Sequence, residues 1–301
     1  MEQYPSESHI TFNDWNTSMV STWCESCGNR PLLMAIKQAF VALQMEPHNT
    51  LIVYGVGCAG NTCSWVNTYG VHGLHGRTLP VATGAKLVNP KLTVIAEGGD
   101  GDAYGIGLAH FIHSARRNID ITYIVHNNQI YGLTTGQASP TTEKGVSSKS
   151  TPCGVIERPI NPLALALSSD ATYIARGYAG DVAHLKDLIL GGISHRGFAL
   201  IDVFQPCITF NKRNTYDWFK ERMYKLDLTD TSSPNYHNVS DKQGAFQKAL
   251  LWGSKIPIGL FFKEDRLTYH DELDQLGGYN DAVVDHIIAD IGINKTLQKF
   301  R

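Results

Sequence analysis

The chain has 301 residues, of which 43% are hydrophobic, 18% charged and 10% aromatic. This composition excludes disordered, collagen-like and coiled-coil proteins and predicts an ordinary globular chain. Lysine and arginine number 26 against 28 for aspartate and glutamate, so the net charge is -2, and the basic residues are scattered along the sequence. We therefore expect neither nucleic acid nor a membrane as a partner.

The N-terminal segment, MEQYPSESHITFNDWN, has neither the basic start nor the apolar run of a secretory signal. No stretch of the sequence approaches the roughly 18 apolar residues that a membrane span needs. We therefore expect a cytoplasmic protein. In that reducing compartment, the six cysteines indicate metal or redox chemistry rather than disulfides.

Apolar side chains at helical spacing predict an amphipathic helix over residues 31–45, and buried strands and further helices then alternate along the chain. This alternation predicts an α/β fold with a mostly parallel sheet that helices cover on both faces. The expected strands are 51–57, 92–101, 119–128, 171–178, 197–204 and 256–262, and the expected later helices are 103–118 and 181–195.

The domain organisation follows from composition. Residues 1–22 have no usable periodicity and predict an N-terminal arm, residues 23–272 predict one domain, and residues 273–301 predict a C-terminal tail. The stretch 136–154 is rich in Gly, Ser, Thr and Pro and is too long for an ordinary connection, which indicates a functional loop.

Four cysteines are expected to meet at one edge of the sheet. Cys24 and Cys27 form a C-x-x-C turn, a spacing that lets both thiolates reach one metal ion or cluster. Cys58 and Cys207 each follow a predicted strand end, and the ends of parallel strands converge. By spacing alone, Cys63 competes with Cys207 as fourth ligand. Zinc, an iron–sulfur cluster and no metal all remain open interpretations at this point.

Residues 55–60, GVGCAG, fit the dinucleotide fingerprint G-x-G-x-x-G after a strand. The segment that follows is a poor helix, and residues 61–96 contain no Asp or Glu that could hold a ribose. The context therefore disfavours nicotinamide binding.

Oxygen ligands follow the next two predicted strands. Asp100 lies in the sequence GDGD, and Asn128 follows it by 28 positions, which is the length of one strand–helix–strand unit. Hard oxygen ligands on neighbouring strand ends, with glycines that admit a phosphate, suit Mg²⁺ bridging a diphosphate. Two polar turns are the alternative interpretation, but the pairing at this distance favours a metal site.

The segments GGDGDAYGIGLAH and VHNNQIYGLTTGQASPTT resemble the thiamine diphosphate motif of the 2-oxoacid:ferredoxin oxidoreductases, specifically of their β subunit. The resemblance covers roughly residues 15–272 and implies the thiamine diphosphate-binding fold of the diphosphate-binding type. The other segments that resemble the family, in the expected order, are WCESCG, GVGCAG, HGLHGRTLPVATGAKL, DVFQPCITFN and IPIGLFFKEDRLTY.

Carried over by position, the resemblance implies roles for individual residues. The side chains of Asp100 and Asn128 and the carbonyl of Ile130 would bind Mg²⁺, and Cys24, Cys27, Cys58 and Cys207 would ligate one 4Fe-4S cluster. His75 would face the cofactor and act as the catalytic residue of this chain. The residues implied to line the cofactor are Val56, Gly57, Cys58, Ala59, His75, Gly101, Asp102, Gly132 and Leu133.

The resemblance also implies a reaction: coenzyme A-dependent oxidative decarboxylation of a 2-oxo acid to acyl-CoA and CO2, with electrons passed through the cluster to ferredoxin. It favours 2-oxoglutarate as substrate, with pyruvate as the alternative. The chain has room for one α/β sheet and resembles the diphosphate-binding half of a thiamine enzyme. The resemblance therefore implies that a partner α subunit supplies the pyrimidine-binding half, in a heterodimer or a dimer of heterodimers. Two other hypotheses are a non-oxidative thiamine diphosphate-dependent lyase and a zinc-stabilised binding subunit.

Overall fold

The computed structural model describes residues 9–275 and contains one central sheet of eight strands. The strand order is β2-β1-β3-β4-β8-β7-β10-β9, and neighbouring strands run parallel except for the antiparallel pair β10 and β7. The strands are β1 (Thr50–Tyr54), β2 (Tyr69–His72), β3 (Thr93–Gly99), β4 (Ile121–Asn127), β7 (Tyr173–Tyr178), β8 (Phe198–Phe204), β9 (Met223–Lys225) and β10 (Ile256–Lys263).

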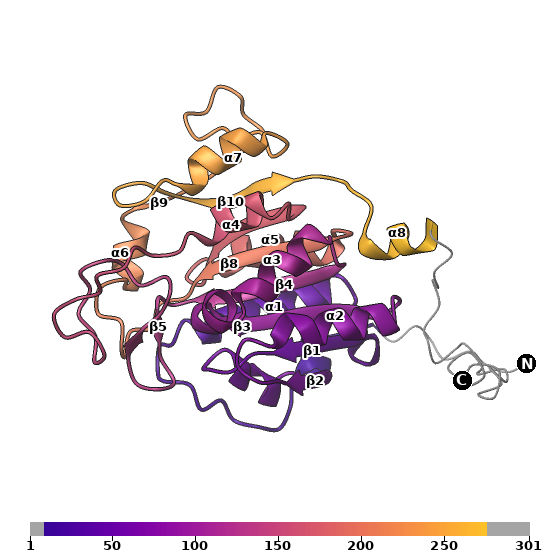
Figure 1. The fold of residues 1–301 in the computed structure, drawn as a ribbon. Coiled ribbons are helices and arrows are strands. Elements are labelled where there is room, and N and C mark those ends of the chain that lie inside the picture. Colours follow the sequence, from indigo (N-terminus) through magenta and orange to yellow (C-terminus); the bar gives the residue numbers. More distant parts are fainter. Residues whose placement is uncertain (1–8, 276–301) are drawn as a thin grey trace, which may run out of the picture.

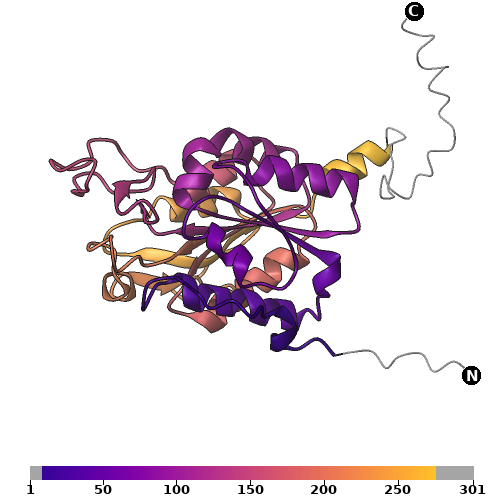
Figure 2. The same ribbon diagram turned by 90° about the horizontal axis from the view of Figure 1, so that it is seen from below.

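Helices cover both faces of this sheet (Figures 1 and 2). One face buries apolar side chains of α2, α3, α4 and α7, and the other buries those of α1 and α5. The α-helices are α1 (Asn29–Ala42), α2 (Thr78–Val88), α3 (Leu108–Arg116), α4 (Pro162–Ser168), α5 (Val182–Ser194), α6 (Tyr216–Lys220), α7 (Lys242–Ala249) and α8 (Tyr269–Gln275). The predicted α/β class, the mostly parallel sheet and its two helical layers are therefore confirmed.

The central strands are apolar because both of their faces are covered. Every residue of β4 and of β8 is buried, which is the pattern expected for parallel strands between two layers of helices. Removing this much apolar surface from water is the main stabilising contribution in such a fold. The rigid sheet fixes the positions of the loops that leave its strand ends.

Several elements differ from those expected from sequence. The predicted helix 103–118 is divided into a π-helix at Gly101–Ile106 and α3. The helix α2 was not among those expected from the sequence. Residues 130–138 form a two-stranded antiparallel sheet of β5 (Ile130–Tyr131) and β6 (Gln137–Ala138). Local turns and packing decided these elements, because the glycines in each segment weaken its intrinsic preference.

The part of the predicted arm that the structure describes lies against the domain. Trp15, in a short 3-10 helix at Phe12–Trp15, is fully buried, and its ring lies 4.5 Å from that of Phe40 of α1. The Lys37 ammonium donates to Asn16 Oδ1 and to the Trp65 carbonyl. Residues 1–8 of the predicted arm and 276–301 of the predicted tail lie outside the described residues.

Candidate active site

The carboxyl ends of β1, β3, β4 and β8 meet at one edge of the sheet, on the side where Figure 1 labels β5. The register brings Tyr54 opposite Glu97, Gly99 opposite His126, and Asn127 opposite Phe204. The loops after these strands therefore start side by side, as expected for a doubly covered parallel sheet.

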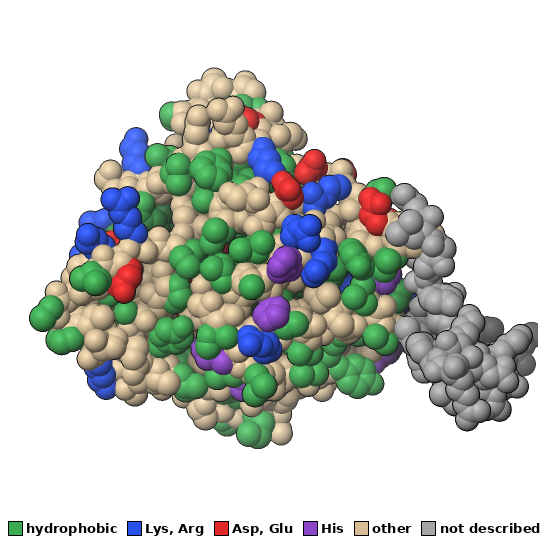
Figure 3. Space-filling view, in the orientation of Figure 1, with side chains coloured by type: hydrophobic (Ala, Val, Ile, Leu, Met, Phe, Trp, Pro, Cys, Tyr) green, Lys and Arg blue, Asp and Glu red, His purple; other side chains and the backbone are tan. Residues whose placement is uncertain are grey.

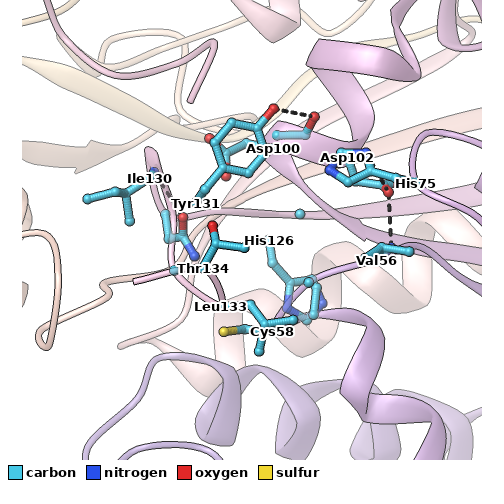
Figure 4. Close-up of a pocket in the computed structure, with 16 residues that line it drawn as sticks. Val56, Cys58, His75, Asp100, Asp102, His126, Ile130, Tyr131, Leu133 and Thr134 are labelled. Atoms are coloured by element: carbon cyan, nitrogen blue, oxygen red, sulfur yellow. Dashed lines mark hydrogen bonds and ion pairs between the residues drawn. The ribbon is translucent and has the colours of Figure 1, made fainter. Parts of the chain in front are cut away.

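A pocket at this edge, which we call the strand-end pocket, brings together all the residues that the sequence suggested for the cofactor and Mg²⁺. Figure 4 shows this pocket with ten of its residues labelled. The structure thus places these residues together, while their roles remain predictions. The predicted residues in the lining are Val56, Gly57, Cys58, Ala59, His75, Asp100, Gly101, Asp102, Asn128, Ile130, Gly132 and Leu133.

Asp100 is buried directly after β3 and is held by two hydroxyl groups. Ser139 Oγ and Thr141 Oγ1 each lie 2.5 Å from Asp100 Oδ2. Burial raises the pKa of this carboxyl to about 6, although the two hydroxyl groups favour the charged form. A cation bound to this carboxylate would offset the free-energy cost of burying its charge.

Asn128 and Ile130 form a short turn after β4. Asn128 Oδ1 accepts from the Ile130 amide at 3.0 Å, and Asn128 Nδ2 donates to Gln205 Oε1 at 3.2 Å. An asparagine oxygen and a peptide carbonyl are both neutral ligands that Mg²⁺ accepts beside a single carboxylate. This donor set fits a magnesium ion that takes its remaining ligands from phosphate oxygens and water.

Asp102 organises the loops around the pocket rather than presenting a free carboxylate to it. Its Oδ1 accepts from the amides of Val56 at 3.0 Å and Gly76 at 2.8 Å, and its Oδ2 accepts from Thr78 Oγ1 at 2.9 Å. The Val56 contact is drawn as a dashed line in Figure 4. One buried carboxylate thus holds the loop after β1 next to the start of α2.

His75 lies beside this carboxylate at the edge of the pocket. Its Nδ1 is 3.5 Å from Asp102 Oδ1, and its side chain is 31% exposed. Its ring centroid lies 6.0 Å from that of Tyr131. A histidine with one nitrogen near a fixed carboxylate and with access to a pocket is suited to holding or moving a proton.

Glycines leave room for a ligand in this pocket. A Cβ at Gly99 or Gly57 would meet no atom within 4 Å, and Gly57 has a φ of +138°, which a side chain would strain. At Gly101 a Cβ would lie 2.2 Å from the Tyr131 ring, whose hydroxyl donates to the Gly101 carbonyl. At Gly57 and Gly99 the backbone can therefore approach a phosphate, whereas the missing side chain of Gly101 makes room for the Tyr131 ring.

A second cavity, which we call the cysteine cavity, adjoins the strand-end pocket and encloses about 160 Å³. Cys24, Cys27, Cys58 and Cys207 all line it. The sulfurs of Cys58 and Cys207 lie within 3.6 Å of the place that a Cβ at Gly132 would take, so this glycine keeps the space between them open.

The four thiols line one cavity, but they do not converge on a single point. Across residues 9–275, no three or more His, Cys, Asp or Glu side chains converge on a point that could hold one metal ion. Tetrahedral zinc would need its sulfurs about 2.3 Å from a common centre. As they lie in the structure, the four cysteines therefore do not form a ready-made zinc site.

Burial favours the protonated form of three of these thiols, Cys27, Cys58 and Cys207. Burial raises the pKa of Cys27 to about 11 and that of Cys58 to about 12, and it also raises the pKa of Cys207. Thiolates bind iron and zinc, so metal binding here would displace protons.

Cys63 and Cys153 lie elsewhere in the described part of the chain. Cys63 Sγ is 3.6 Å from His72 Nδ1 and is not in the lining of the cysteine cavity, whereas Cys153 is exposed. The position of Cys63 weighs against it as an alternative to Cys207.

Sequence reasoning did not single out four further residues of the strand-end pocket, namely Gly99, His126, Tyr131 and Thr134. His126 is the most constrained of them, because its Nδ1 is 2.7 Å from Asn29 Oδ1 and its Nε2 is 3.0 Å from Glu97 Oε1. All three residues are buried, and Asn29 lines the cysteine cavity. A histidine inside an apolar strand gave no sequence signal of this contact.

Comparison with known proteins identifies the family of this chain. Residues 52–203 match the family "Thiamine pyrophosphate enzyme, C-terminal TPP binding domain", and residues 207–277 match the C-terminal family of the pyruvate ferredoxin oxidoreductase β subunit. The β subunit of 2-oxoacid:ferredoxin oxidoreductase 1 from Aeropyrum pernix is 44% identical over 266 residues, which cover 87% of this chain and 84% of that protein. This chain belongs to the β subunits of the 2-oxoacid:ferredoxin oxidoreductases.

Other members of this oxidoreductase family are similarly close. The β subunit from a Sulfolobus species is 47% identical over 262 residues, covering 85% of this chain and 86% of the relative. A 2-oxoglutarate synthase subunit from Archaeoglobus fulgidus is 37% identical, over 78% of this chain and 88% of its own length. The chain is therefore a subunit of an enzyme complex that oxidises 2-oxo acids.

The fold also matches a solved complex of the family. The 2-oxoglutarate:ferredoxin oxidoreductase from Magnetococcus marinus, solved with 2-oxoglutarate, coenzyme A and succinyl-CoA bound, superposes with a TM-score of 0.85 at 34% identity. The match covers 96% of this chain and 99% of that chain.

No helix in residues 9–275 has the length and apolar character that crossing a membrane requires.

Proposed function

We propose that the strand-end pocket binds the diphosphate of thiamine diphosphate through Mg²⁺, with Asp100, Asn128 and the Ile130 carbonyl as the protein ligands. The buried carboxylate, the neutral oxygens beside it and the open space at Gly57 and Gly99 support this assignment. The remaining implied residues, from Val56 to Ala59 and from Gly132 to Leu133, would contact the cofactor from the sides of the pocket.

The size of the pocket supports the need for a partner subunit. The enclosed space is about 70 Å³, whereas sites for whole cofactors typically enclose several hundred Å³. It therefore suits the phosphate end, and the rest of the cofactor would extend beyond it, against an α subunit. We expect activity only in the assembled complex, as a heterodimer or a dimer of heterodimers in the cytoplasm.

We further propose that Cys24, Cys27, Cys58 and Cys207 bind one 4Fe-4S cluster. The observation that carries the proposed function is the wall shared by the two cavities: Cys58, Asn128, Gly132 and Leu133 line both. A cluster bound to Cys58 would thus adjoin the cofactor, which gives electrons a short route out of the pocket.

This arrangement supports oxidative rather than non-oxidative chemistry. When bound, the thiamine cofactor supplies the electron sink that allows CO2 to leave a 2-oxo acid. The chain's own residues would bind and orient that cofactor, and His75, next to Asp102, would hold or move a proton at its edge. The proposed products are acyl-CoA and CO2, with coenzyme A as cosubstrate and ferredoxin as acceptor of the electrons, one at a time. We favour 2-oxoglutarate over pyruvate as the substrate.

The deciding experiment is to co-express the chain with its α partner, purify the complex without oxygen, and measure iron, acid-labile sulfide and zinc per β chain. We expect about four irons and four sulfides with little zinc, from the composition of the cluster. The complex should then reduce a low-potential acceptor when given a 2-oxo acid and coenzyme A. Zinc without sulfide would overturn the electron route and favour the non-oxidative lyase or the zinc-stabilised binding subunit.

A further inference from the structure

A third cavity, which we call the Arg176 cavity, lies near α4 and the end of α7 and encloses about 200 Å³. It shares no lining residue with the strand-end pocket or the cysteine cavity. Its walls combine apolar surfaces with a few polar groups. The lining residues that matter for the argument are Gln129, Ile160, Arg176, Phe204, Ala249 and Trp252.

Arg176, on the central strand β7, is the charged group of this cavity and is only 2% exposed. Its guanidinium carbon lies 5.0 Å from the ring centroid of Phe204 and 5.6 Å from that of Phe261. Neither Nε nor Nη1 has a hydrogen-bond partner. A buried donor without an acceptor destabilises the protein, and more so when it is charged.

The neighbouring carboxylate does not satisfy these donors. Arg176 Nε is 3.7 Å from Asp202 Oδ2, which is too long for a hydrogen bond. Asp202 instead accepts from the Tyr104 hydroxyl at 3.0 Å and from Asn127 Nδ2 at 3.1 Å. Asp202 thus balances the charge of Arg176 from the side of Nε, and it leaves Nη1 without any partner.

The polar and apolar groups together define the chemistry of a ligand. The unpaired N–H groups require oxygen acceptors, and a carboxylate is the acceptor that a guanidinium binds best. The apolar surfaces of Ile160, Phe204 and Trp252 suit a short hydrocarbon body. Gln129 Oε1, which is buried and also has no hydrogen-bond partner, disfavours a doubly charged phosphate and could accept from a hydroxyl group.

We propose that the Arg176 cavity is a second small-molecule site, which takes a small aliphatic carboxylate with its oxygens on Arg176 and its carbon body against Trp252. The volume of about 200 Å³ corresponds to about seven water molecules, at roughly 30 Å³ each, so the ligand is small. Trp252 is 38% exposed, which leaves one side of the cavity open for entry.

The site is joined to the predicted magnesium ligand by a chain of buried polar groups. Asn127 donates to Asp202, and the Thr141 hydroxyl lies 3.0 Å from Asn127 Oδ1 and 2.5 Å from Asp100 Oδ2. Asn127 and Thr141 also line the Arg176 cavity. A bound carboxylate would therefore lie behind the strand-end pocket, where it can influence the side chains that position Asp100.

The experiment uses trifluoroacetate as the probe, because its fluorine signal reports binding directly, and trifluoroethanol as a neutral control of similar size. Fluorine NMR titrations are carried out on the purified complex with its α partner. Ala249→Leu fills the cavity while keeping the Arg176–Asp202 pair, and the double change Arg176→Met with Asp202→Asn removes both charges together. Arg116→Met, which removes an exposed positive charge on α3, is the matched control.

We expect saturable binding of trifluoroacetate but not of trifluoroethanol, at least tenfold weaker in Ala249→Leu and in the double variant and unchanged in Arg116→Met. Equal binding of trifluoroacetate in the wild type and Ala249→Leu would overturn the proposal. The absence of saturable binding in the wild type, which would mean that the cavity holds water only, would overturn it as well. If the double variant fails to fold, Ala249→Leu still decides. The assay requires neither thiamine diphosphate nor a cluster, so its failure is separate from a failure of the proposed function.

Discussion

The strand-end pocket and the cysteine cavity share a wall but are held together in different ways. The first is built by buried hydrogen bonds between loops that leave adjacent strands, above all those to Asp100 and Asp102. The second is closed by the segment before α1, which reaches the strand ends through a few hydrogen bonds. These run from Trp23 Nε1 to the Cys58 carbonyl at 2.7 Å, from the Gly28 amide to the Pro206 carbonyl at 3.2 Å, and from Gln205 Nε2 to Cys27 Sγ at 3.6 Å. Figure 3 shows one face of the molecule, on which charged and apolar side chains are both exposed.

From this difference we predict that the strand-end pocket keeps its shape without a ligand, whereas the cysteine cavity gains more of its stability from the group that it binds. Asp100 and Asp102 are each at most 2% exposed, whereas Cys24, on the segment before α1, is exposed. A cluster would join three segments that are far apart in sequence, around residues 24–27, 58 and 207. The two regions should therefore fail separately when their own ligands are changed.

The largest effect is expected from Cys207→Ser. A serine oxygen is a poor ligand for iron in place of a thiolate, so we expect the iron content to fall to near zero and ferredoxin reduction to be lost. Binding of thiamine diphosphate in the presence of Mg²⁺ should stay within about threefold of wild type, an estimate that rests on additivity between distinct sites. Iron analysis and calorimetry measure the two properties.

Cys63→Ser and Cys153→Ser are the matched controls for this change, because both residues lie outside the cysteine cavity. We expect both variants to keep their iron. Loss of the cluster in Cys63→Ser together with its retention in Cys207→Ser would show that the fourth ligand has been assigned to the wrong cysteine.

Asp100→Ala is the reciprocal change. It removes the single carboxylate of the predicted magnesium site, so we expect affinity for thiamine diphosphate to fall by more than about 100-fold, beyond the 10–100-fold typical of groups that only orient a ligand. Iron should be unchanged. Asp187→Ala, which removes an exposed carboxylate on α5, is the control. Parallel loss of iron would mean that the two regions are not independent.

A smaller effect is expected from Ser139→Ala, which removes one of the two hydroxyl groups on Asp100 Oδ2. Groups that orient a metal ligand typically contribute 10–100-fold to affinity, and we expect a loss towards the lower end because Thr141 remains. Titration of Mg²⁺ at fixed thiamine diphosphate measures the change. Ser148→Ala, at a half-buried position of the same loop whose hydroxyl contacts Thr151, should leave the affinity unaltered, and an equal loss in both variants would argue against this role of Ser139.

The smallest effect is expected from Trp23→Phe. This change keeps the aromatic packing against Trp65 but removes the hydrogen bond to the Cys58 carbonyl. One such bond contributes about 1 kcal/mol, so we expect the cluster to be retained but to release iron to a chelator about fivefold faster. Trp218→Phe, at a distant aromatic contact, is the control. Identical release rates in Trp23→Phe and wild type would show that this contact does not hold the cavity closed.

The sequence by itself determined the fold class and indicated that Asp100 lies near Asn128 and that the four cysteines meet at one edge of the sheet, whereas the family resemblance added the other predicted residues of the strand-end pocket. Alternating apolar strands and helices were sufficient for the covered parallel sheet, because burial on two faces requires continuous apolar runs such as those of β4 and β8. The spacing from Asp100 to Asn128, and the positions of Cys58 and Cys207 after strand ends, followed from the geometry of parallel strands. Family resemblance then supplied the predicted roles.

Only the tertiary structure decided how each side chain is used. Asp102 was expected to line the cofactor, yet its oxygens are occupied by amides and a hydroxyl from residues 56, 76 and 78. His126, Glu97 and Arg176 lie within apolar strands, where their local sequence resembles that of any buried strand. Their contacts join residues far apart in the chain, so they depend on strand order and register, which no local pattern encodes.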